Sequence, residues 1–384
     1  MPRQSISIGN KKIGSGHPVF IIAEAGVNHN GKLSLAKKLI DAAARAGADA
    51  VKFQTFKPDT LVTKKAEKAG YQKRNERNPS RLRRRVLPLQ KGESEAEESQ
   101  YEMLLRLQLP RVWHRKLKAY AERKGLVFLS TPFSLHDALF LKRLWVRAIK
   151  VGSSDANNLP FLRAIAQWGL PILLSTGMSD LSEIKEAVHA IQNPSPRRLG
   201  TPFRKGRIRK TPLILLHCTT NYPTPFPEAN LRAIETMQRV FDVSVGFSDH
   251  TLGYEAACAA VALGAVALEK HVTLDRSLPG PDHSASLEPD ELRDFVRHIR
   301  NTEAALGSGK KAPFRSEKEI AKVARKSLIT LRNIRKGEQF TARNLGIKRP
   351  GTGLPPKYYE TVIGAKANKD IPRDTPLTKN DSTR

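Results

Sequence analysis

The sequence predicts an α/β protein, with a closed (β/α)8 barrel followed by a small β-rich domain. Two observations predict the barrel. Eight short apolar runs alternate with segments of helical spacing, and a polar side chain able to do chemistry stands at the carboxyl end of nearly every run. A doubly wound open sheet would spread these side chains along a line, whereas a barrel gathers them around one mouth. No glycine-rich nucleotide-binding motif follows any run, which disfavours the open sheet.

The eight runs are rich in Val, Ile, Leu and Phe, as buried parallel strands are. In chain order they are VFIIAE (19–24), AVKFQT (50–55), LVFLST (126–131), AIKVGS (148–153), PILLST (171–176), LILLHC (213–218), VSVGFS (243–248) and AVALEKH (265–271).

The segments that follow the runs have the apolar spacing of amphipathic helices, and several end at a glycine, as helices often do. They are LSLAKKLIDAAARAG (33–47), SLHDALFLKRLW (134–145), LPFLRAIAQWG (159–169), LSEIKEAVHAI (181–191), PEANLRAIETMQRV (227–240), GYEAACAAVALG (253–264) and PDELRDFVRHIRNTEAALG (289–307).

A chain of 384 residues is too long for one ordinary domain but suits a barrel of about 250 residues with an appendage. We predict the barrel over residues 1–306 and a charged linker over 307–325. The last segment, 326–384, has alternating strands and tight turns, which predict the β-rich domain. Two half-motifs in it, NIRKGEQFTARNL (333–345) and DIPRDTPLTKNDS (370–382), are similar and suggest a short repeat.

The net charge of +29 raises the question of a polyanionic partner. Residues 73–92 hold eight Lys/Arg against one Glu, and residues 197–210, inside an insertion predicted over 194–210, hold seven and no acid. Both segments are rich in Pro, Gly and Arg and lack interleaved aromatic residues. We interpret them as solvated loops, with a nucleic-acid site as the less favoured alternative.

The chain has no apolar run near the roughly 20 residues that a membrane helix needs, and its N-terminus has no apolar signal core. Its two cysteines, Cys218 and Cys258, lie in apolar segments, so we expect buried thiols and no disulfide framework. These features predict a cytoplasmic protein with no membrane partner.

Two histidines, His250 and His271, end neighbouring predicted strands, 21 residues apart. In a barrel they would enter the same mouth. Neutral imidazoles bind Mn, Fe, Co or Zn, and a site with two of them keeps positions open for substrate. The alternative is that each histidine only bonds to a backbone group at its strand end. We expect His217 to face the same mouth, but to bond only to a backbone group at its strand end and not to bind a metal.

Two lysines, Lys52 and Lys150, stand near apolar strand ends, with hydroxyls at Thr131, Ser153 and Ser175. Two converging cations among several donors suit a compact polyanion such as a phosphate ester that carries a carboxylate.

Glu24 ends the first strand, where a carboxylate can orient or deprotonate a water. Its alternative role is a structural salt bridge with a lysine. For His29 and His114 the sequence indicates no partner.

The sequence resembles the sialic acid synthase family, which includes N-acetylneuraminate, legionaminic and pseudaminic acid synthases. The resemblance runs from residue 17 to about residue 380 and breaks only at the two basic insertions. It rests on ten blocks in order: IIAEAGVNHNG, DAVKFQTF, ESQYEML, FLSTPF, KVGSSDANN, LSTGM, HCTTNYPTP, GFSDHTLG, LEKHVTLDRSLPGPDHSASLEP and KRPGTGL. It implies a TIM barrel and a C-terminal (SAF) domain similar to type III antifreeze proteins.

The resemblance further implies an enzyme that condenses phosphoenolpyruvate with an N-acetylated hexosamine and releases phosphate. The acceptor would be N-acetylmannosamine, or alternatively the 2,4-diacetamido sugar of legionaminic or pseudaminic acid synthases. His250 and His271 would bind a divalent metal, typically Mn2+, with Mg2+ or Co2+ possible. Other roles follow by position: Lys52, Thr131, Lys150, Ser153 and Ser175 hold phosphoenolpyruvate, Glu24 manages the water, and Tyr222, Glu269 and Asp282 surround the sugar.

Arg349 matches an arginine that the family delivers from the partner subunit onto the N-acetyl group, which implies a domain-swapped homodimer. Two residues depart from the family pattern on the sugar side, Thr220 and Ser154. A second hypothesis, a non-catalytic barrel that binds polyanions through its Arg-rich loops, has no need of the full set of polar strand-end residues.

Overall fold

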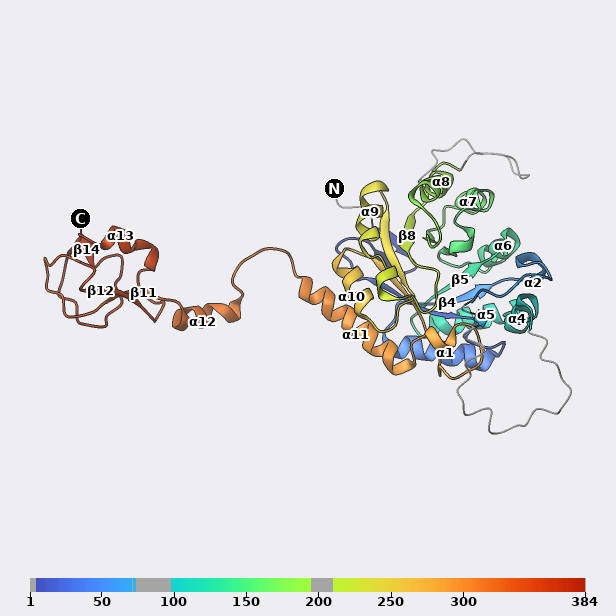
Figure 1. Cartoon of the computed structure of the whole chain (residues 1–384), viewed down its shortest axis with the longest axis horizontal. Coiled ribbons are helices and arrows are strands. Elements are labelled where there is room, and N and C mark those ends of the chain that lie inside the picture. Colours follow the sequence, from blue (N-terminus) through green and yellow to red (C-terminus); the bar gives the residue numbers. More distant parts are fainter. Residues whose placement is uncertain (1–4, 71, 74–97, 195–209, 384) are drawn as a thin grey trace. The chain divides into compact units, whose positions relative to one another are not determined.

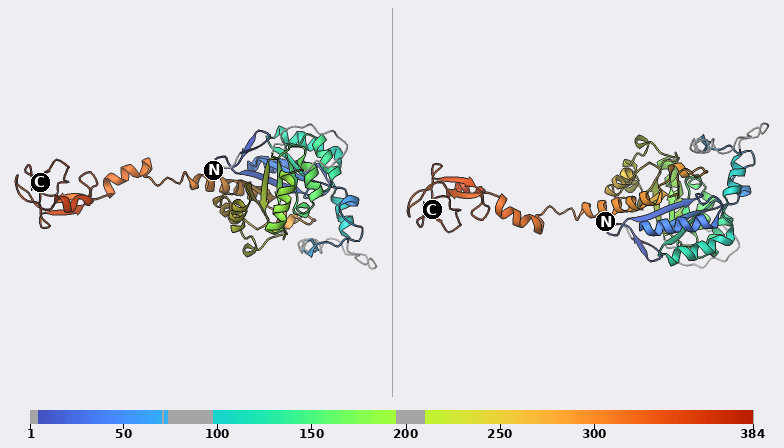
Figure 2. Two further views of the ribbon diagram at one scale, coloured as in Figure 1. Left: turned by 90° about the horizontal axis from the view of Figure 1, so that it is seen from above. Right: turned by 90° about the horizontal axis from the view of Figure 1, so that it is seen from below.

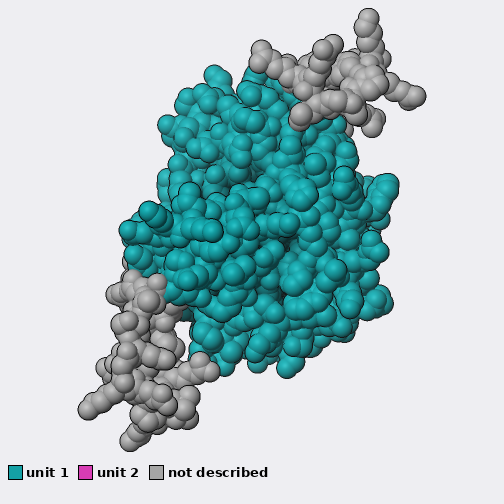
Figure 3. Space-filling view, turned by 90° about the vertical axis from the view of Figure 1, so that its right-hand side faces the viewer, with its two compact units in different colours: residues 1–307 teal, residues 308–384 magenta. Residues whose placement is uncertain are grey.

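The computed structural model describes residues 5–70, 72–73, 98–194 and 210–383. They form two compact units, Met1–Gly307 and Ser308–Arg384 (Figure 1). Apart from their ends, the two Arg-rich segments that we predict as solvated loops lie outside the described residues. Figure 3 shows one face of the first unit.

The first unit is an eight-stranded parallel barrel, which confirms the predicted fold class. The strands are hydrogen-bonded in the order β5-β4-β3-β10-β9-β8-β7-β6, and β5 lies against β6, which closes the sheet. Their bounds are β3 (Phe20–Gly26), β4 (Ala50–Thr55), β5 (Val127–Pro132), β6 (Ile149–Val151), β7 (Ile172–Ser175), β8 (Leu213–His217), β9 (Ser244–Asp249) and β10 (Ala267–His271).

Helices surround the barrel (Figures 1 and 2). Helices such as α1, α7 and α11 pack apolar residues against the strands. Local signals set several helix ends: a capping box at Ser99 starts α4, another at Asp180 starts α8, and α1 ends at Gly47 in the left-handed region. The helices are α1 (Leu33–Ala46), α2 (Pro58–Leu61), α4 (Gln100–Leu107), α5 (Arg111–Arg123), α6 (Leu135–Arg143), α7 (Leu159–Ala166), α8 (Leu181–Gln192), α9 (Arg232–Val240), α10 (Glu255–Ala262) and α11 (Pro289–Leu306).

Strand alternation divides the barrel core into two layers. Residues such as Ile22, Leu173 and Leu216 fill the interior, while Ile21 and Leu215 pack against the helices. In such a barrel the strand interiors supply stability and the carboxyl ends are free for function.

A short hairpin that the sequence did not predict precedes the barrel, with strands β1 (Ile6–Ile8) and β2 (Lys11–Ile13). Ile8 and Ile13 are fully buried and belong to the interior cluster together with Phe20, at the start of β3. The hairpin therefore closes the amino-terminal end of the barrel and leaves the other end as its mouth.

The second unit has its own small core. Ile334 and Ile371 exchange backbone hydrogen bonds of 2.9 and 2.8 Å, so the two predicted half-motifs pair with one another. The segment predicted as a linker contains a helix. The elements are α12 (Arg315–Ala324), β11 (Ser327–Thr330), β12 (Leu345–Lys348), α13 (Tyr359–Val362), β13 (Lys366–Ala367) and β14 (Ser382–Thr383). Among the described residues, no helix is long and apolar enough to cross a membrane.

Candidate active site

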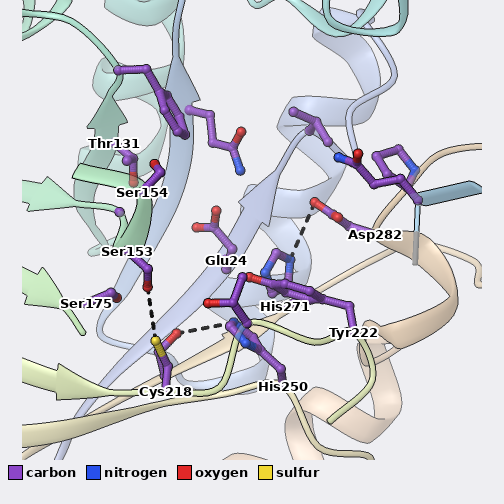
Figure 4. Close-up of a pocket in the computed structure, with 18 of the residues that line it drawn as sticks. Glu24, Thr131, Ser153, Ser154, Ser175, Cys218, Tyr222, His250, His271 and Asp282 are labelled. Carbon is purple, nitrogen blue, oxygen red and sulfur yellow. Dashed lines mark hydrogen bonds and ion pairs between the residues drawn. The ribbon is translucent and has the colours of Figure 1, made fainter. Parts of the chain in front are cut away.

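A cavity of about 430 Å3 opens among the carboxyl ends of the barrel strands (Figure 4). Side chains far apart in the chain point toward this common space. The predicted site residues of the barrel all line it: Glu24, Lys52, Thr131, Lys150, Ser153, Ser175, Tyr222, His250, Glu269, His271 and Asp282. Arg349 belongs to the second unit, at the end of β12.

Lys52 lines the cavity and contacts two carboxylates. Its Nζ lies 3.2 Å from Glu24 Oε2 and 3.3 Å from Glu269 Oε2, and it donates a 3.1 Å hydrogen bond to Thr131 Oγ1. Burial would lower the pKa of this lysine, but the two carboxylates outweigh burial and raise it. Lys52 is therefore a charged cation that the fold itself stabilises.

Lys150 is the second cation, and its surroundings are poorer in negative charge. It donates to Ser175 Oγ at 2.7 Å and lies 3.5 Å from Glu269 Oε1. Burial lowers its pKa, and nearby Lys52 lowers it further against the pull of Glu269. The protein thus holds a second positive charge that its own carboxylates do not fully balance, which is what an anionic ligand would complete.

Glu24 and Glu269 have opposite pKa shifts although both carboxyls are buried. Burial raises the pKa of Glu24 well above its ordinary value, since Lys52 compensates only in part. For Glu269, Lys150, Lys52 and a 3.0 Å hydrogen bond from Ser248 Oγ outweigh burial and lower the pKa. One carboxyl therefore gains and releases a proton readily near neutral pH, while the other stays ionised.

The two histidines line the same cavity at the carboxyl ends of the neighbouring strands β9 and β10, with ring centroids 5.6 Å apart. His250 Nδ1 lies 2.7 Å from the carbonyl oxygen of Thr219, which fixes the proton on Nδ1 and turns Nε2 toward the cavity. The Tyr222 ring packs 4.0 Å from His250 and 5.5 Å from His271, centroid to centroid. His271 Nδ1 lies 4.0 Å from Asp282 Oδ2.

These residues fit a metal bound by two imidazoles. Burial lowers the pKa of His250 to about 4 and holds the pKa of His271 well below its ordinary value, so both rings are neutral, as ligands must be. His271 Nδ1 is buried and has no hydrogen-bond partner among the described residues. The described residues contain no group of three or more His, Cys, Asp and Glu arranged for a metal. Two imidazoles would leave the remaining positions for water and substrate.

The interpretation that His217 faces the mouth is wrong. Leu216 points into the barrel, so strand alternation turns His217 outward. There its Nε2 lies 2.8 Å from the carbonyl oxygen of Ala229 and its ring stacks on Phe247. It is the satisfied strand-end histidine that the sequence also suggested.

The histidines without a predicted partner are buried outside the cavity lining. His114 Nε2 lies 2.8 Å from Thr55 Oγ1, and His29 Nδ1 accepts a hydrogen bond from the backbone N–H of Gly31.

The sequence interpretation assigned Cys218 only a packing role, but this thiol lines the cavity, 3.2 Å from Ser153 Oγ (Figure 4). Its place at the end of a strand was the available signal. Gly177 lies beside it, and a Cβ there would stand 2.3 Å from Thr220 Oγ1 and 2.9 Å from Ser153 Oγ. A larger residue at this position would therefore displace the side chains of the cavity wall. Ser154 and Thr220, which depart from the family pattern, also line the cavity.

A closed barrel with a buried pocket at the carboxyl ends of its strands is the arrangement of a barrel enzyme that acts on a small molecule. Comparison with known families makes the assignment specific. The NeuB family profile matches residues 39–311, and the SAF domain profile matches residues 325–381. The chain belongs to the NeuB family.

Three relatives illustrate the likeness. The chain is 42% identical over 369 residues to the N,N'-diacetyllegionaminic acid synthase of Legionella pneumophila, covering 96% of each chain. It is 36% identical over 358 residues to a pseudaminic acid synthase of Campylobacter jejuni, covering 92% of this chain and 93% of that one. A crystal structure of N-acetylneuraminic acid synthetase from Leptospira borgpetersenii, in complex with citrate, has 35% identity and a TM-score of 0.66, covering 83% of this chain and 95% of that one.

Proposed function

We propose that this protein is a nonulosonic acid synthase that condenses phosphoenolpyruvate with the aldehyde of an N-acetylated hexosamine and releases phosphate. The observation that carries the proposal is the pair of buried lysines, Lys52 and Lys150, that line the cavity. Phosphoenolpyruvate carries a carboxylate and a phosphate on a small frame, and two cations among hydroxyl donors suit it. The names of the relatives support the reaction class and leave both N-acetylmannosamine and a 2,4-diacetamido sugar as acceptors.

In the proposed reaction, carbon 3 of phosphoenolpyruvate bonds to the aldehyde carbon, and the aldehyde oxygen takes up a proton. Carbon 2 becomes electron-poor, and a water adds to it. The bond between carbon 2 and the phosphate oxygen then breaks, which gives phosphate and a 2-keto acid. Glu24 is suited to take the proton of the water when it is ionised, because a carboxyl whose pKa burial raises to about 8 keeps that proton at neutral pH.

Other side chains would orient the substrates. Lys150, with Ser175, would bind the anionic end of phosphoenolpyruvate. Glu269 stays ionised and is fixed by Ser248, so it can accept a hydrogen bond from a sugar hydroxyl. Tyr222 packs against both imidazoles and limits their rotation.

We propose Mn2+, with Mg2+ or Co2+ as alternatives, as a cofactor held by His250 and His271. The neutral rings and the unpartnered buried nitrogen of His271 support this. When bound, such an ion would polarise the aldehyde as a Lewis acid.

We further propose that the second unit serves the site of a partner subunit in a domain-swapped homodimer, with Arg349 contacting the N-acetyl group. The small size of its core supports a unit that works packed against another surface. We propose the cytoplasm as the compartment, since both cysteines are free thiols.

The test is phosphate release from phosphoenolpyruvate by the purified protein with Mn2+, in the presence of N-acetylmannosamine, the 2,4-diacetamido sugar or no acceptor, each with and without a chelator. Release that depends on a sugar and is lost with the chelator is expected. If neither sugar supports phosphate release, or if release does not need a sugar, the proposal is contradicted. Full activity of His271→Ala would contradict the metal assignment.

A further inference from the structure

We infer that Asn28 and Asn30 are positioning residues that hold Asp282 at the cavity wall for the acceptor sugar. They lie on the loop that follows β3 and form hydrogen bonds to the segment between β10 and α11, both before and after Asp282 in the chain. The inference rests on the proposed function for the identity of the substrate, but the contacts that carry it are independent of that function.

Asp282 needs such support because its own carboxylate does little to fix the loop. Its ionic contact, 4.0 Å to His271 Nδ1, is too long for a hydrogen bond. The carboxylate is nevertheless buried. The described residues give this carboxylate no hydrogen bond, so its position depends on how the backbone of Asp282 is held.

Asn28 makes the first set of these hydrogen bonds. It is fully buried, and its Nδ2 donates to the carbonyl oxygen of Val272 at 2.8 Å and to Ser286 Oγ at 2.9 Å. Ser286 Oγ in turn donates to the carbonyl oxygen of Asp282 at 2.6 Å. One amide thus ties the residue after His271 to the backbone of Asp282, which sets the spacing of these two side chains.

Asn30 makes the second contact, a hydrogen bond to His283. Its Oδ1 lies 3.2 Å from Nε2 of His283, the residue after Asp282. The other ring nitrogen of His283 lies 2.6 Å from Thr273 Oγ1. Gly280 keeps this arrangement tight, because a Cβ there would stand 2.8 Å from His283 Cδ2.

The arrangement has the features of a supporting shell rather than of an ordinary loop contact. Asn28 and Asn30 come from the loop directly after Glu24 and β3, while the residues they hold lie about 250 positions later. Groups that orient a site residue from behind, without touching the ligand, commonly change affinity or activity by about 10- to 100-fold when removed. Neither asparagine lines the cavity, and Asp282 does.

The test uses Asn28→Ala, Asn28→Asp, Asn30→Ala and Ser286→Ala, with Asn193→Ala as a control. Asn193 is exposed at the end of α8, where its amide contacts only that helix among the described residues. The acceptor is whichever of the two sugars the wild-type enzyme turns over. We expect kcat/KM for the sugar to fall about 10- to 100-fold in the Asn28, Asn30 and Ser286 variants, while KM for phosphoenolpyruvate changes less than about twofold. The loss in the Asn28→Ala, Ser286→Ala double variant should be less than the product of the single losses.

A second readout needs no turnover. Amide hydrogen exchange should accelerate in residues 272–288 of Asn28→Ala and Asn30→Ala and stay unchanged elsewhere in the barrel. Unchanged sugar kinetics together with unchanged exchange would overturn the inference, as would an equal loss for both substrates. If Asn28→Ala does not fold, the half-buried Asn30 gives the same test. An inactive wild-type enzyme with accelerated exchange in the variants would count against the proposed function alone.

Discussion

The two cavity lysines should respond to substitution with opposite effects on stability, and this contrast follows from their surroundings. Lys52 is 5% exposed and contacts two carboxylates, which raise its pKa, so its charge stabilises the folded state. Lys52→Met leaves Glu24 and Glu269 buried without this partner. Removing one member of a buried ion pair costs about 3–5 kcal/mol, so we expect the free energy of unfolding to fall by that amount.

Lys150→Met is the matched comparison, since burial lowers the pKa of Lys150 and its charge opposes folding. This variant should keep the wild-type stability or gain up to about 1 kcal/mol, as happens when a functional charge is removed. Urea unfolding measures both, and both variants should lose phosphate release by at least about 100-fold. Equal destabilisation by the two substitutions would refute the assignment of Lys52 as the structural cation and of Lys150 as the unbalanced one.

Three further predictions concern space, pH and the second unit. Gly177→Ala should abolish phosphate release with little change in the thermal midpoint, because a Cβ would stand 2.3 Å from Thr220 Oγ1 at the cavity wall. A normal rate of phosphate release would show that the substrates do not contact this part of the wall. Burial lowers the pKa of His114 to about 4, below its unfolded value of about 6.5, so the stability that its neutral form provides is present above pH 6.5 and is lost as pH falls toward 4. His114→Asn should remove about 1.4 kcal/mol per pH unit from the slope of unfolding free energy between pH 6 and 5, and an unchanged slope would contradict this. Arg349→Ala should raise KM for the sugar and leave KM for phosphoenolpyruvate unchanged, whereas identical kinetics would remove Arg349 from the site.

Most of the barrel could be predicted because its strands are buried on both faces and therefore appear as continuous apolar runs. Ile172 to Ser175, for example, lies inside the run predicted at 171–176. The sequence did not predict the hairpin of β1 and β2, because three-residue strands have too few positions to show a period of hydrophobicity, although Ile8 and Ile13 are fully buried. Its burial depends on the open end of a barrel that only the complete fold creates.

The strand-end residues of the cavity could be predicted from one rule, that the carboxyl ends of barrel strands meet at one mouth, whereas Tyr222, Glu269 and Asp282 were assigned through the family resemblance. The rule failed at His217 because the direction of a side chain depends on strand alternation, and Leu216 already faces inward. The roles of Lys52 and Lys150 could not be told apart, since the difference lies in carboxylates that come from other strands. For the same reason no local pattern pointed to Asn28, whose partner Ser286 lies on a distant loop.

The proposed reaction in this pocket joins phosphoenolpyruvate to a sugar and breaks the bond between carbon 2 and the phosphate oxygen. The most direct measurement uses phosphoenolpyruvate that carries a heavy oxygen isotope in the bridging position, with Mn2+ and an acceptor sugar, and follows the label by mass spectrometry. We predict that the label appears in the released phosphate and that release requires the sugar. Release that needs no sugar and leaves the label in pyruvate would contradict the account, because water would then have attacked phosphorus.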